Sequence, residues 1–264
     1  MKRLSLVGIA ALVFMLSACD LTELNENPNE SADVATPNLL TNAQSYLADT
    51  YWKDYAGGFW VRYAQYWTTN QYSDADRYLF PTRRAGSNDN NWSRFYLALN
   101  DLEEIKRINR QTPEDAAGYG PAANQIAIAQ ILQAFTWQMM TDMWGPIPFE
   151  EALRGREDGN FAPAYSSQET IYPALLDSLT AASDMIDTST PALASGDLIY
   201  GGDMENWKQL ANSLKLRIAI RMADVNESAA ETAIDEALTA GAFESNDDNA
   251  AIPFSSSPPY QNPY

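Results

Sequence analysis

The sequence contains no histidine and a single cysteine, and these absences exclude several kinds of chemistry. Without histidine there is no imidazole base, no Ser-His-Asp triad and no histidine–metal centre. With one cysteine, no disulfide forms within the chain and no cysteine cluster holds a metal. We expect neither a metal ion nor a cofactor.

Basic residues are also scarce. The chain has 17 Lys and Arg against 35 Asp and Glu, a formal net charge of −18. Binding a polyanion requires a basic surface, so nucleic acid is excluded as a partner. The hydrophobic content of 45% is ordinary for a globular chain with a buried core.

The first residues are typical of an exported lipoprotein. Lys2 and Arg3 precede a mostly apolar run, residues 4–16, which is too short to span a membrane. The run ends in Leu-Ser-Ala before Cys19, as in a bacterial lipobox. We therefore predict a signal peptide over residues 1–18, acylation of Cys19, and attachment to a membrane through lipid alone. The alternative is an ordinary secretory signal in which the cysteine is incidental.

The mature chain divides into a tether and a domain. Residues 19–36 are acidic and rich in Asn, which is typical of a solvated linker. Thr36 and Pro37 then form an N-cap and a first helical position, so we expect a helix that runs to about Tyr51. The domain is expected to fill residues 37–264.

Apolar residues at helical spacing predict most of this domain. The expected helices cover residues 60–67, 92–108, 122–144, 168–182, 207–222 and 229–240. Loops are expected over 70–91, 145–167 and 188–203, and no segment alternates with period two. The fold class is therefore all-α, with TPR-like helical hairpins and long irregular loops. The Ser-, Pro- and Asn-rich end after Asp247 reads as a loop cut in mid-course, so we expect that a C-terminal portion is missing.

Four segments in order carry a family resemblance. They are Cys19-Asp20; Asn-Glu-Asn-Pro-Asn at 25–29 with Ala-Thr-Pro-Asn-Leu-Leu at 35–40; Asp-Met-Trp-Gly-Pro-Ile-Pro-Phe-Glu-Glu-Ala-Leu at 142–153; and Trp-Lys-Gln-Leu-Ala-Asn-Ser-Leu-Lys-Leu-Arg at 207–217. Together they resemble the SusD/RagB family of outer-membrane nutrient-binding lipoproteins of Bacteroidetes, in its SusD-like branch. Members of that family are considerably longer, so the chain resembles their N-terminal half.

The resemblance implies a SusD-like, TPR-containing lipoprotein on the outer membrane, exposed at the cell surface. Such proteins bind glycans or other nutrients without catalysis and deliver them to a SusC-like TonB-dependent transporter. Their TPR helices mainly contact this barrel partner and pack the scaffold. Ligand-contacting residues differ between members, so none is carried over to this chain.

Aromatic residues are concentrated in one stretch, which supplies our candidate ligand site. Residues 46–80 hold 12 aromatic residues, against 30 in the whole chain. Aromatic faces stack on the C–H faces of sugars, while amides and charged groups bind the hydroxyls. The candidate ligand-binding residues are Trp67, Asn70, Gln71, Tyr72, Asp74, Asp76, Arg77 and Tyr78. The alternative is that most rings are core, because Trp60, Tyr63 and Trp67 keep helical spacing; Tyr72 and Tyr78 are the better candidates.

Other charged groups have simpler interpretations. Asp142, Glu150 and Glu151 flank the Trp-Gly-Pro-Ile-Pro turn, and the two glutamates suit the start of a helix better than a glycosidase pair. The Asn/Asp stretches 88–91 and 246–249 lack the glycine and glutamate of an EF-hand and are expected to be solvated turns. Three basic residues near the end of one expected helix are expected to pair within this acidic chain: Lys215, Arg217 and Arg221.

The function expected from these observations is binding of a nutrient, with an oligosaccharide as the first choice, and its delivery to a TonB-dependent transporter. Two alternatives remain open. One is a lipid-anchored glycoside hydrolase that uses paired carboxylates, and the other is a TPR adaptor without a small ligand. Turnover distinguishes the first from a binder, and binding of protein alone identifies the second.

Overall fold

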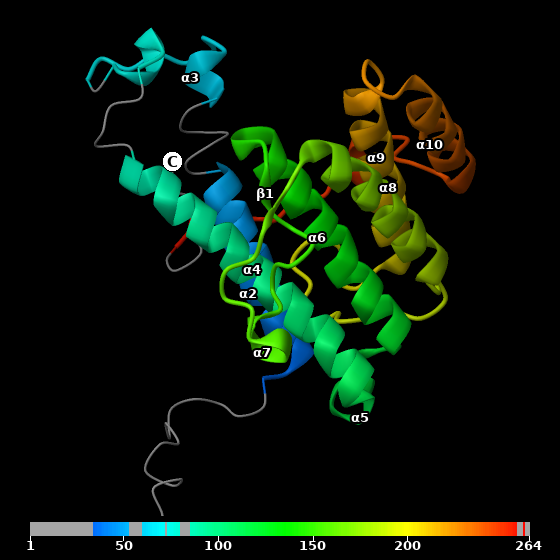
Figure 1. Ribbon diagram of the computed structural model, residues 1–264. Helices are drawn as coiled ribbons and strands as arrows, with labels where there is room; N and C mark the ends of the chain where they lie inside the picture. The colour runs from blue at the N-terminus through cyan, green and yellow to red at the C-terminus, as the bar shows by residue number, and fades with distance from the viewer. Residues whose placement is uncertain (1–33, 53–59, 72, 80–84, 258–260, 262–264) are drawn as a thin grey trace, which may run out of the picture. The chain divides into compact units, whose positions relative to one another are not determined.

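The computed structural model describes residues 34–52, 60–71, 73–79, 85–257 and 261. Over these residues the regular secondary structure is helical apart from one very short pair of strands, which confirms the all-α prediction (Figure 1). The predicted signal peptide, Cys19 and nearly all of the tether lie outside the described residues. No helix among the described residues has the length and apolar character needed to cross a membrane.

Helix α2, Thr36–Asp49, begins one residue earlier than predicted. Ala35 is the N-cap and Thr36 is the first helical residue, so the predicted N-cap role of Thr36 is wrong. The Thr36 hydroxyl is buried and instead donates a hydrogen bond of 2.8 Å to Oε1 of Gln125. The hydroxyl that the local sequence pattern assigns to an N-cap is therefore used in a tertiary hydrogen bond.

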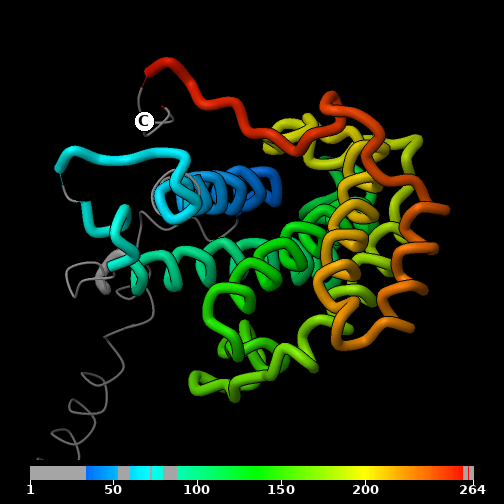
Figure 2. Tube along the Cα trace, turned by 90° about the horizontal axis from the view of Figure 1, so that it is seen from above, coloured from blue at the N-terminus to red at the C-terminus, as the bar shows by residue number. Residues whose placement is uncertain are grey.

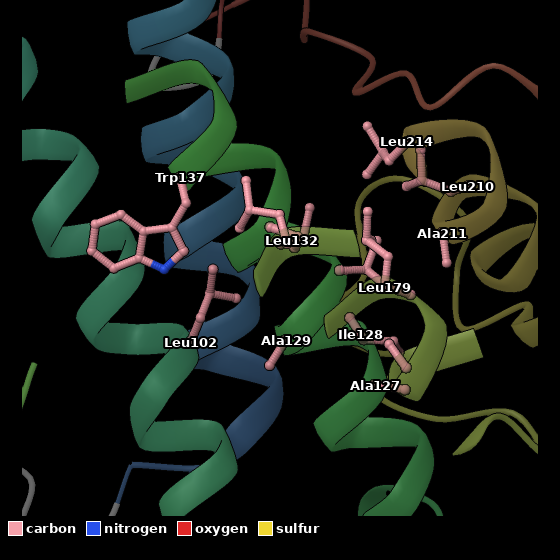
Figure 3. Packing of buried hydrophobic residues seen from close by; sticks show 14 of the residues in the cluster. Leu102, Ala127, Ile128, Ala129, Leu132, Trp137, Leu179, Leu210, Ala211 and Leu214 are labelled. Carbon is pink, nitrogen blue, oxygen red and sulfur yellow. The ribbon is translucent and has the colours of Figure 1, made fainter. Parts of the chain in front are cut away.

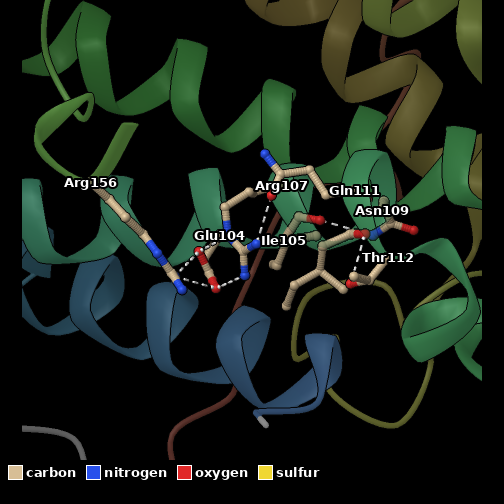
Figure 4. A network of polar contacts seen from close by, with 8 residues as sticks. Glu104, Ile105, Arg107, Asn109, Gln111, Thr112 and Arg156 are labelled. Atoms are coloured by element: carbon tan, nitrogen blue, oxygen red, sulfur yellow. Dashed lines mark hydrogen bonds and ion pairs between the residues drawn. The ribbon is translucent and has the colours of Figure 1, made fainter. Parts of the chain in front are cut away.

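Helix α4, Ala85–Gln111, is longer than predicted, because it includes much of the stretch expected to be a loop. Residues 88–91 are therefore helical, and their expected role as a solvated turn is wrong. The outer face of α4 carries charged groups that bind one another (Figure 4). Glu104 accepts two hydrogen bonds from Arg107 and lies 3.2 Å from Nη1 of Arg156, which comes from the short helix α7.

Helix α6, Ala122–Trp144, has the predicted bounds and lies at the centre of the core. It is apolar on nearly all sides, as expected for a helix that is covered by neighbours. Figure 3 shows buried side chains from α4, α6, α8 and α9 packed together. The labelled members of this cluster include Leu102, Ile128, Leu132, Leu179 and Leu210.

Three helices complete the array: α8, Gln168–Met185; α9, Met204–Met222; and α10, Glu227–Ala240. Ser167 caps α8, since its hydroxyl accepts a hydrogen bond from the N–H of Thr170. Asp203 and Asn226 cap α9 and α10 in the same way. Helix α10 ends at residue 240, as predicted, with Gly241 as its C-cap.

Consecutive long helices pack side by side along the chain. Helix α2 packs on α4, α4 on α6, α6 on α8, α8 on α9, and α9 on α10 (Figures 1 and 2). This nearest-neighbour order is the arrangement of stacked helical hairpins and confirms the TPR-like prediction. The described residues from Ala35 onward form one compact unit.

Short elements fill the connections. The 145–167 connection holds strands β1, Ile147–Pro148, and β2, Tyr165–Ser166, paired antiparallel, and helix α7, Gly155–Asp158. Helices α5, Pro113–Ala116, and η5, Ala117–Tyr119, join α4 to α6. Helix η6, Asn246–Asp248, is closed by a capping box from Ser245, so the second Asn/Asp stretch is a capped turn.

Candidate functional site

The segment that carries most predicted ligand residues is irregular. Helix α3, Val61–Tyr63, is a single turn, and Gln65 ends it with a positive φ of 60°. The predicted helix over residues 60–67 is therefore wrong beyond Tyr63, because the left-handed Gln65 turns the chain away. A second short helix, η3, Ala75–Arg77, ends at Tyr78, whose φ is 56°.

Asp76 ties the two ends of this segment together. Its Oδ2 accepts hydrogen bonds of 2.8 Å from the N–H and from the hydroxyl of Thr69, and one of 3.3 Å from the hydroxyl of Thr68. The donors on Thr69 hold the pKa of Asp76 below its usual range, with a further contribution from Arg62. Asp76 therefore organises the segment as an anion, and Oδ1 has no hydrogen-bond partner among the described residues.

Three aromatic side chains are exposed on this segment. Tyr66 is 82% exposed, Tyr78 60% and Trp67 48%, so Trp67 is not a core residue here. The Tyr78 ring stacks on that of Tyr63, with centroids 5.8 Å apart and an interplanar angle of 28°. We call residues Tyr63, Tyr66, Trp67 and Tyr78 the aromatic surface. Sequence reasoning left Tyr66 out, although it lies in the aromatic-rich stretch.

The other predicted ligand residues surround these rings along the chain. Asn70, Gln71 and Arg77 are exposed, and Asp74 is half-buried. Oδ1 of Asp74 lies 3.8 Å from Nη2 of Arg77. Tyr72 lies outside the described residues. The structure thus places seven of the eight candidates on one segment, with Asp76 in a positioning role.

A cleft of about 530 Å³ lies where α2, α6 and α9 end and α4 begins. Tyr51 follows α2 and Trp60 precedes α3, with ring centroids 5.7 Å apart in an edge-to-face contact. The lining side chains, which we call the helix-end cleft, are Tyr51, Trp60, Asn88, Gln138, Met139, Asp142, Met143, Trp144, Arg217 and Arg221. Trp60 and the aromatic surface therefore lie at the two ends of the single turn α3.

Asp142 is the centre of a polar network in this cleft. Oδ2 of Asp142 lies 2.8 Å from Nη2 of Arg221, and its two oxygens also accept hydrogen bonds from Tyr172 and Gln138. Burial and the bond to Asp142 raise the pKa of the Tyr172 hydroxyl. Asp142 is thus fully engaged as a hydrogen-bond acceptor, which suits orientation of neighbours better than proton transfer.

The basic residues of α9 divide into two groups. Lys215 pairs with Glu236 and Arg221 with Asp142, which confirms the predicted pairing for these two. The prediction is wrong for Arg217, because no carboxylate among the described residues lies within 4.0 Å of its guanidinium. Arg217 and Arg221 are four residues apart and both lie near the C-terminal end of α9. This spacing is visible in the sequence and indicates that the two side chains lie on one face of the helix.

A second, mostly apolar cavity of about 690 Å³ adjoins the cleft. It lies between α2, α6, α9 and the segment 243–254, and it shares Tyr51 and Arg217 with the helix-end cleft. Arg217 therefore stands at the boundary between an apolar and a polar space. The negative potential at the C-terminal ends of α2, α6 and α9 favours a cation in such a place.

An open hollow lined by Trp92, Tyr96, Pro148, Ala162, Pro163 and Tyr165 is also aromatic. The rings of Trp92 and Tyr165 stack with centroids 6.5 Å apart, and Trp92 meets Trp144 edge to face at 5.0 Å. Tyr96 donates a hydrogen bond of 2.8 Å to the carbonyl of Pro148, and burial raises the pKa of this phenol. Sequence reasoning assigned Trp92 and Tyr96 to a helix face alone.

The remaining predicted carboxylates have local partners. Glu150 accepts a hydrogen bond of 3.1 Å from the Ser166 hydroxyl. Glu151 accepts bonds from the N–H of Ala164 at 3.0 Å and from Asn160 at 3.2 Å, and these donors lower its pKa. Residues 150–153 form turns and not the expected start of a helix. The side chains of Glu150 and Glu151 therefore stabilise this loop through their hydrogen bonds.

Comparison with known proteins decides the family. A family model described as "Starch-binding associating with outer membrane", of the SusD-like type, matches residues 28–264. The chain belongs to the SusD-like family. This is a family of non-catalytic binding proteins, and its description associates it with the outer membrane. No curated protein matches the chain.

Solved SusD-like structures share the fold. A chitin-binding protein has 27% identity and a TM-score of 0.64, over 81% of this chain and 45% of its own. A SusD homologue from Bacteroides uniformis has 26% identity and a TM-score of 0.59, over 83% and 44%. A chitin-binding SusD homologue from Flavobacterium johnsoniae has 27% identity and a TM-score of 0.53, over 66% and 34%. The chain thus spans about half the length, or less, of the solved relatives it matches.

Proposed function

We propose that this SusD-like chain binds a glycan through the aromatic surface and passes it to a SusC-like TonB-dependent transporter of the outer membrane. The observation that carries the proposal is the exposure of three rings, Tyr66, Trp67 and Tyr78, on one short segment. Large exposed aromatic residues are costly unless they meet a ligand, and their faces suit the C–H faces of sugars. Two similar structures are named as chitin-binding, which supports a glycan as the first choice.

The segment also has the polar groups that sugar hydroxyls require. Asn70, Gln71 and Arg77 are exposed next to the rings along the chain. The stacking of Tyr78 on Tyr63 and the hydrogen bonds of Asp76 hold the segment in shape before a ligand arrives. Such pre-organisation lowers the entropy that binding must overcome.

A glycan-panel titration of the protein, followed by tryptophan fluorescence, tests this proposal. We expect saturable binding of one glycan class that weakens at least tenfold in Tyr78→Ala and Trp67→Ala. Phe161→Ala is the matched control, because Phe161 is 86% exposed and lies between α7 and β2, on a different connection. Equal affinities in all three variants would overturn the assignment of the surface.

The same samples separate binding from catalysis. We propose that the protein releases no product, and reducing sugar that accumulates with time would establish the hydrolase alternative instead. Binding of protein partners with no response to any glycan would establish the adaptor.

The proposed location and partner have their own tests. We propose a lipid anchor on Cys19 and a place on the outer membrane at the cell surface. Intact mass of the membrane-extracted protein is expected to exceed that of the polypeptide by the acyl groups, and Cys19→Ala is expected to abolish the increase. Co-purification of a TonB-dependent barrel with the wild-type protein tests the partner.

A further inference from the structure

Arg217 is an exposed cation that lines both the helix-end cleft and the apolar cavity, and it lacks a carboxylate partner among the described residues. Its Nη2 donates to Oε1 of Gln138 and lies 3.6 Å from Sδ of Met139, and its Cζ lies 5.4 Å from the centroid of the Phe135 ring. A guanidinium has five N–H donors, and Nε and Nη1 make no hydrogen bond within the described part of the chain. Donors therefore remain for a ligand.

Asp142 is the one acid among the described residues that line the helix-end cleft, and both of its carboxylate oxygens already have hydrogen-bond partners. Arg221 lies 2.8 Å from Asp142, and Tyr172 and Gln138 donate to its two oxygens. Gln138 thus donates to Asp142 with its NH₂ and accepts from Arg217 with its oxygen. This bridge fixes the amide, and no carboxylate among the described residues lies within 4.0 Å of the Arg217 guanidinium.

The charge balance of the cleft is the reverse of that of the chain. Two arginines and one aspartate line the cleft, whereas the whole chain has twice as many acids as bases. Partial desolvation lowers the pKa of Arg217, and the guanidinium stays charged at neutral pH. A guanidinium with unused N–H donors in the lining of a cleft is suited to bind an anion.

The remaining lining limits which anion fits. A planar carboxylate matches the fork of a guanidinium in a two-bond arrangement. Tyr51 and Trp60 offer aromatic faces or edges, and the amides of Asn88 and Gln138 offer polar groups, which together suit a sugar ring. The volume of about 530 Å³ falls within the usual range of small-molecule sites, about 300–1,000 Å³.

We propose that the helix-end cleft binds an acidic sugar, a uronic acid unit of an oligosaccharide, with its carboxylate on Arg217. This inference rests on the proposed glycan-binding function and specifies its substrate class. The unit is held between Tyr51 and Trp60 on one side and Gln138 and Arg217 on the other. The rest of the oligosaccharide extends along α3 toward the aromatic surface, since Trp60 is the N-cap of that single turn and Tyr63 is its last residue.

Isothermal titration with a galacturonic acid trimer and with its methyl ester tests the inference. The ester keeps the ring and linkage but removes the charge, so only a carboxylate site distinguishes the two. We expect the acid to bind the wild-type protein at least tenfold more tightly than the ester. Arg217→Gln is expected to remove this preference, and Arg156→Gln, which changes the net charge equally at a mostly exposed residue, is expected to retain it.

Arg217→Lys is a second variant that keeps the test valid if Arg217→Gln does not fold. Lysine keeps the positive charge but lacks the two-donor fork of the guanidinium. It is expected to bind the acid with a reduced preference of about threefold over the ester. Equal binding of acid and ester by the wild-type protein, alongside binding of neutral glycans, would overturn the inference and leave the proposed function standing. A stably folded Arg217→Gln that keeps the full preference would also overturn it. Absence of binding by every neutral and acidic glycan would overturn both.

Discussion

The indole Nε1 of Trp207 donates a hydrogen bond of 2.8 Å to Oδ2 of Asp197, a buried carboxylate between α8 and α9. The same carboxylate accepts from Nε2 of Gln44 in α2 at 2.9 Å and from the N–H of Gly202 at 2.9 Å. Asp197 therefore joins α2, the 188–203 connection and α9, three parts of the chain far apart in sequence. Two further N–H groups, of Ile199 and Tyr200, complete its set of donors.

Asp197→Asn is expected to destabilise the fold by about 3 kcal/mol, because an amide has one acceptor oxygen and directs its NH₂ at donors. Chemical denaturation followed by tryptophan fluorescence measures the free energy of unfolding. Asp203→Asn is the matched control, since asparagine caps helices as well as aspartate does, and its effect is expected to stay within about 0.5 kcal/mol. Equal effects of the two variants would contradict the role of Asp197.

Gly196 has no room for a side chain. A Cβ at this position would lie 2.1 Å from the carbonyl oxygen of Pro37, which is backbone of the first turn of α2. We expect Gly196→Ala to cost about 3 kcal/mol in the free energy of unfolding, because the backbone must move. Gly118→Ala, where nothing lies within 4 Å of the added Cβ, is expected to have no cost. A thermal melt of each variant checks the difference.

The Glu104 cluster in Figure 4 predicts a dependence of stability on pH. Hydrogen bonds from Arg107 lower the pKa of Glu104, with help from Arg156. A lowered folded-state pKa gives stability that is present above the ordinary value of 4.5 and is lost as the pH falls through the folded value. Glu104→Gln is therefore expected to be less stable by about 0.5–1 kcal/mol at pH 7.

This deficit should disappear in acid, where the wild-type glutamate is itself neutral. Urea denaturation of both proteins at pH 7 and at pH 3 measures it. A deficit that is constant across this range would show that packing, and not charge, is responsible. Asp158→Asn, in a more exposed pair with Arg154, is a control with a smaller expected effect at pH 7.

The sequence predicted α6 and the end of α10 well, because strong local signals act there. Residues 122–144 are apolar on nearly all sides, and Gly145 and Pro146 stop the helix. The start of α4 was missed because Ser, Asn and Asp have low helix propensity and read as a loop. A tertiary contact stabilises this turn in the structure: Nε1 of Trp144 donates to Oδ1 of Asn88 at 3.3 Å.

The candidate site was predictable in composition and not in shape. Aromatic density located the segment around Trp67 and Tyr78, but helical spacing placed Trp67 in a helix that Gln65 ends. A positive φ at glutamine is uncommon and has no sequence signal. Likewise the sequence showed Arg217 but could not show that α6 places Gln138, and not an acid, beside it.

Asp76 holds the segment that carries the aromatic surface, and it is less exposed than the rings of that surface. Asp76→Asn replaces a carboxylate that accepts from Thr68 and Thr69 by an amide that satisfies fewer of these donors. We expect glycan affinity to fall about fivefold, the equivalent of about 1 kcal/mol for one lost hydrogen bond, while global stability changes by less than about 0.5 kcal/mol. Titration and denaturation of the same sample measure the two effects separately. Unchanged affinity would show that the segment binds without this brace, whereas an equal loss in stability would make Asp76 part of the general scaffold.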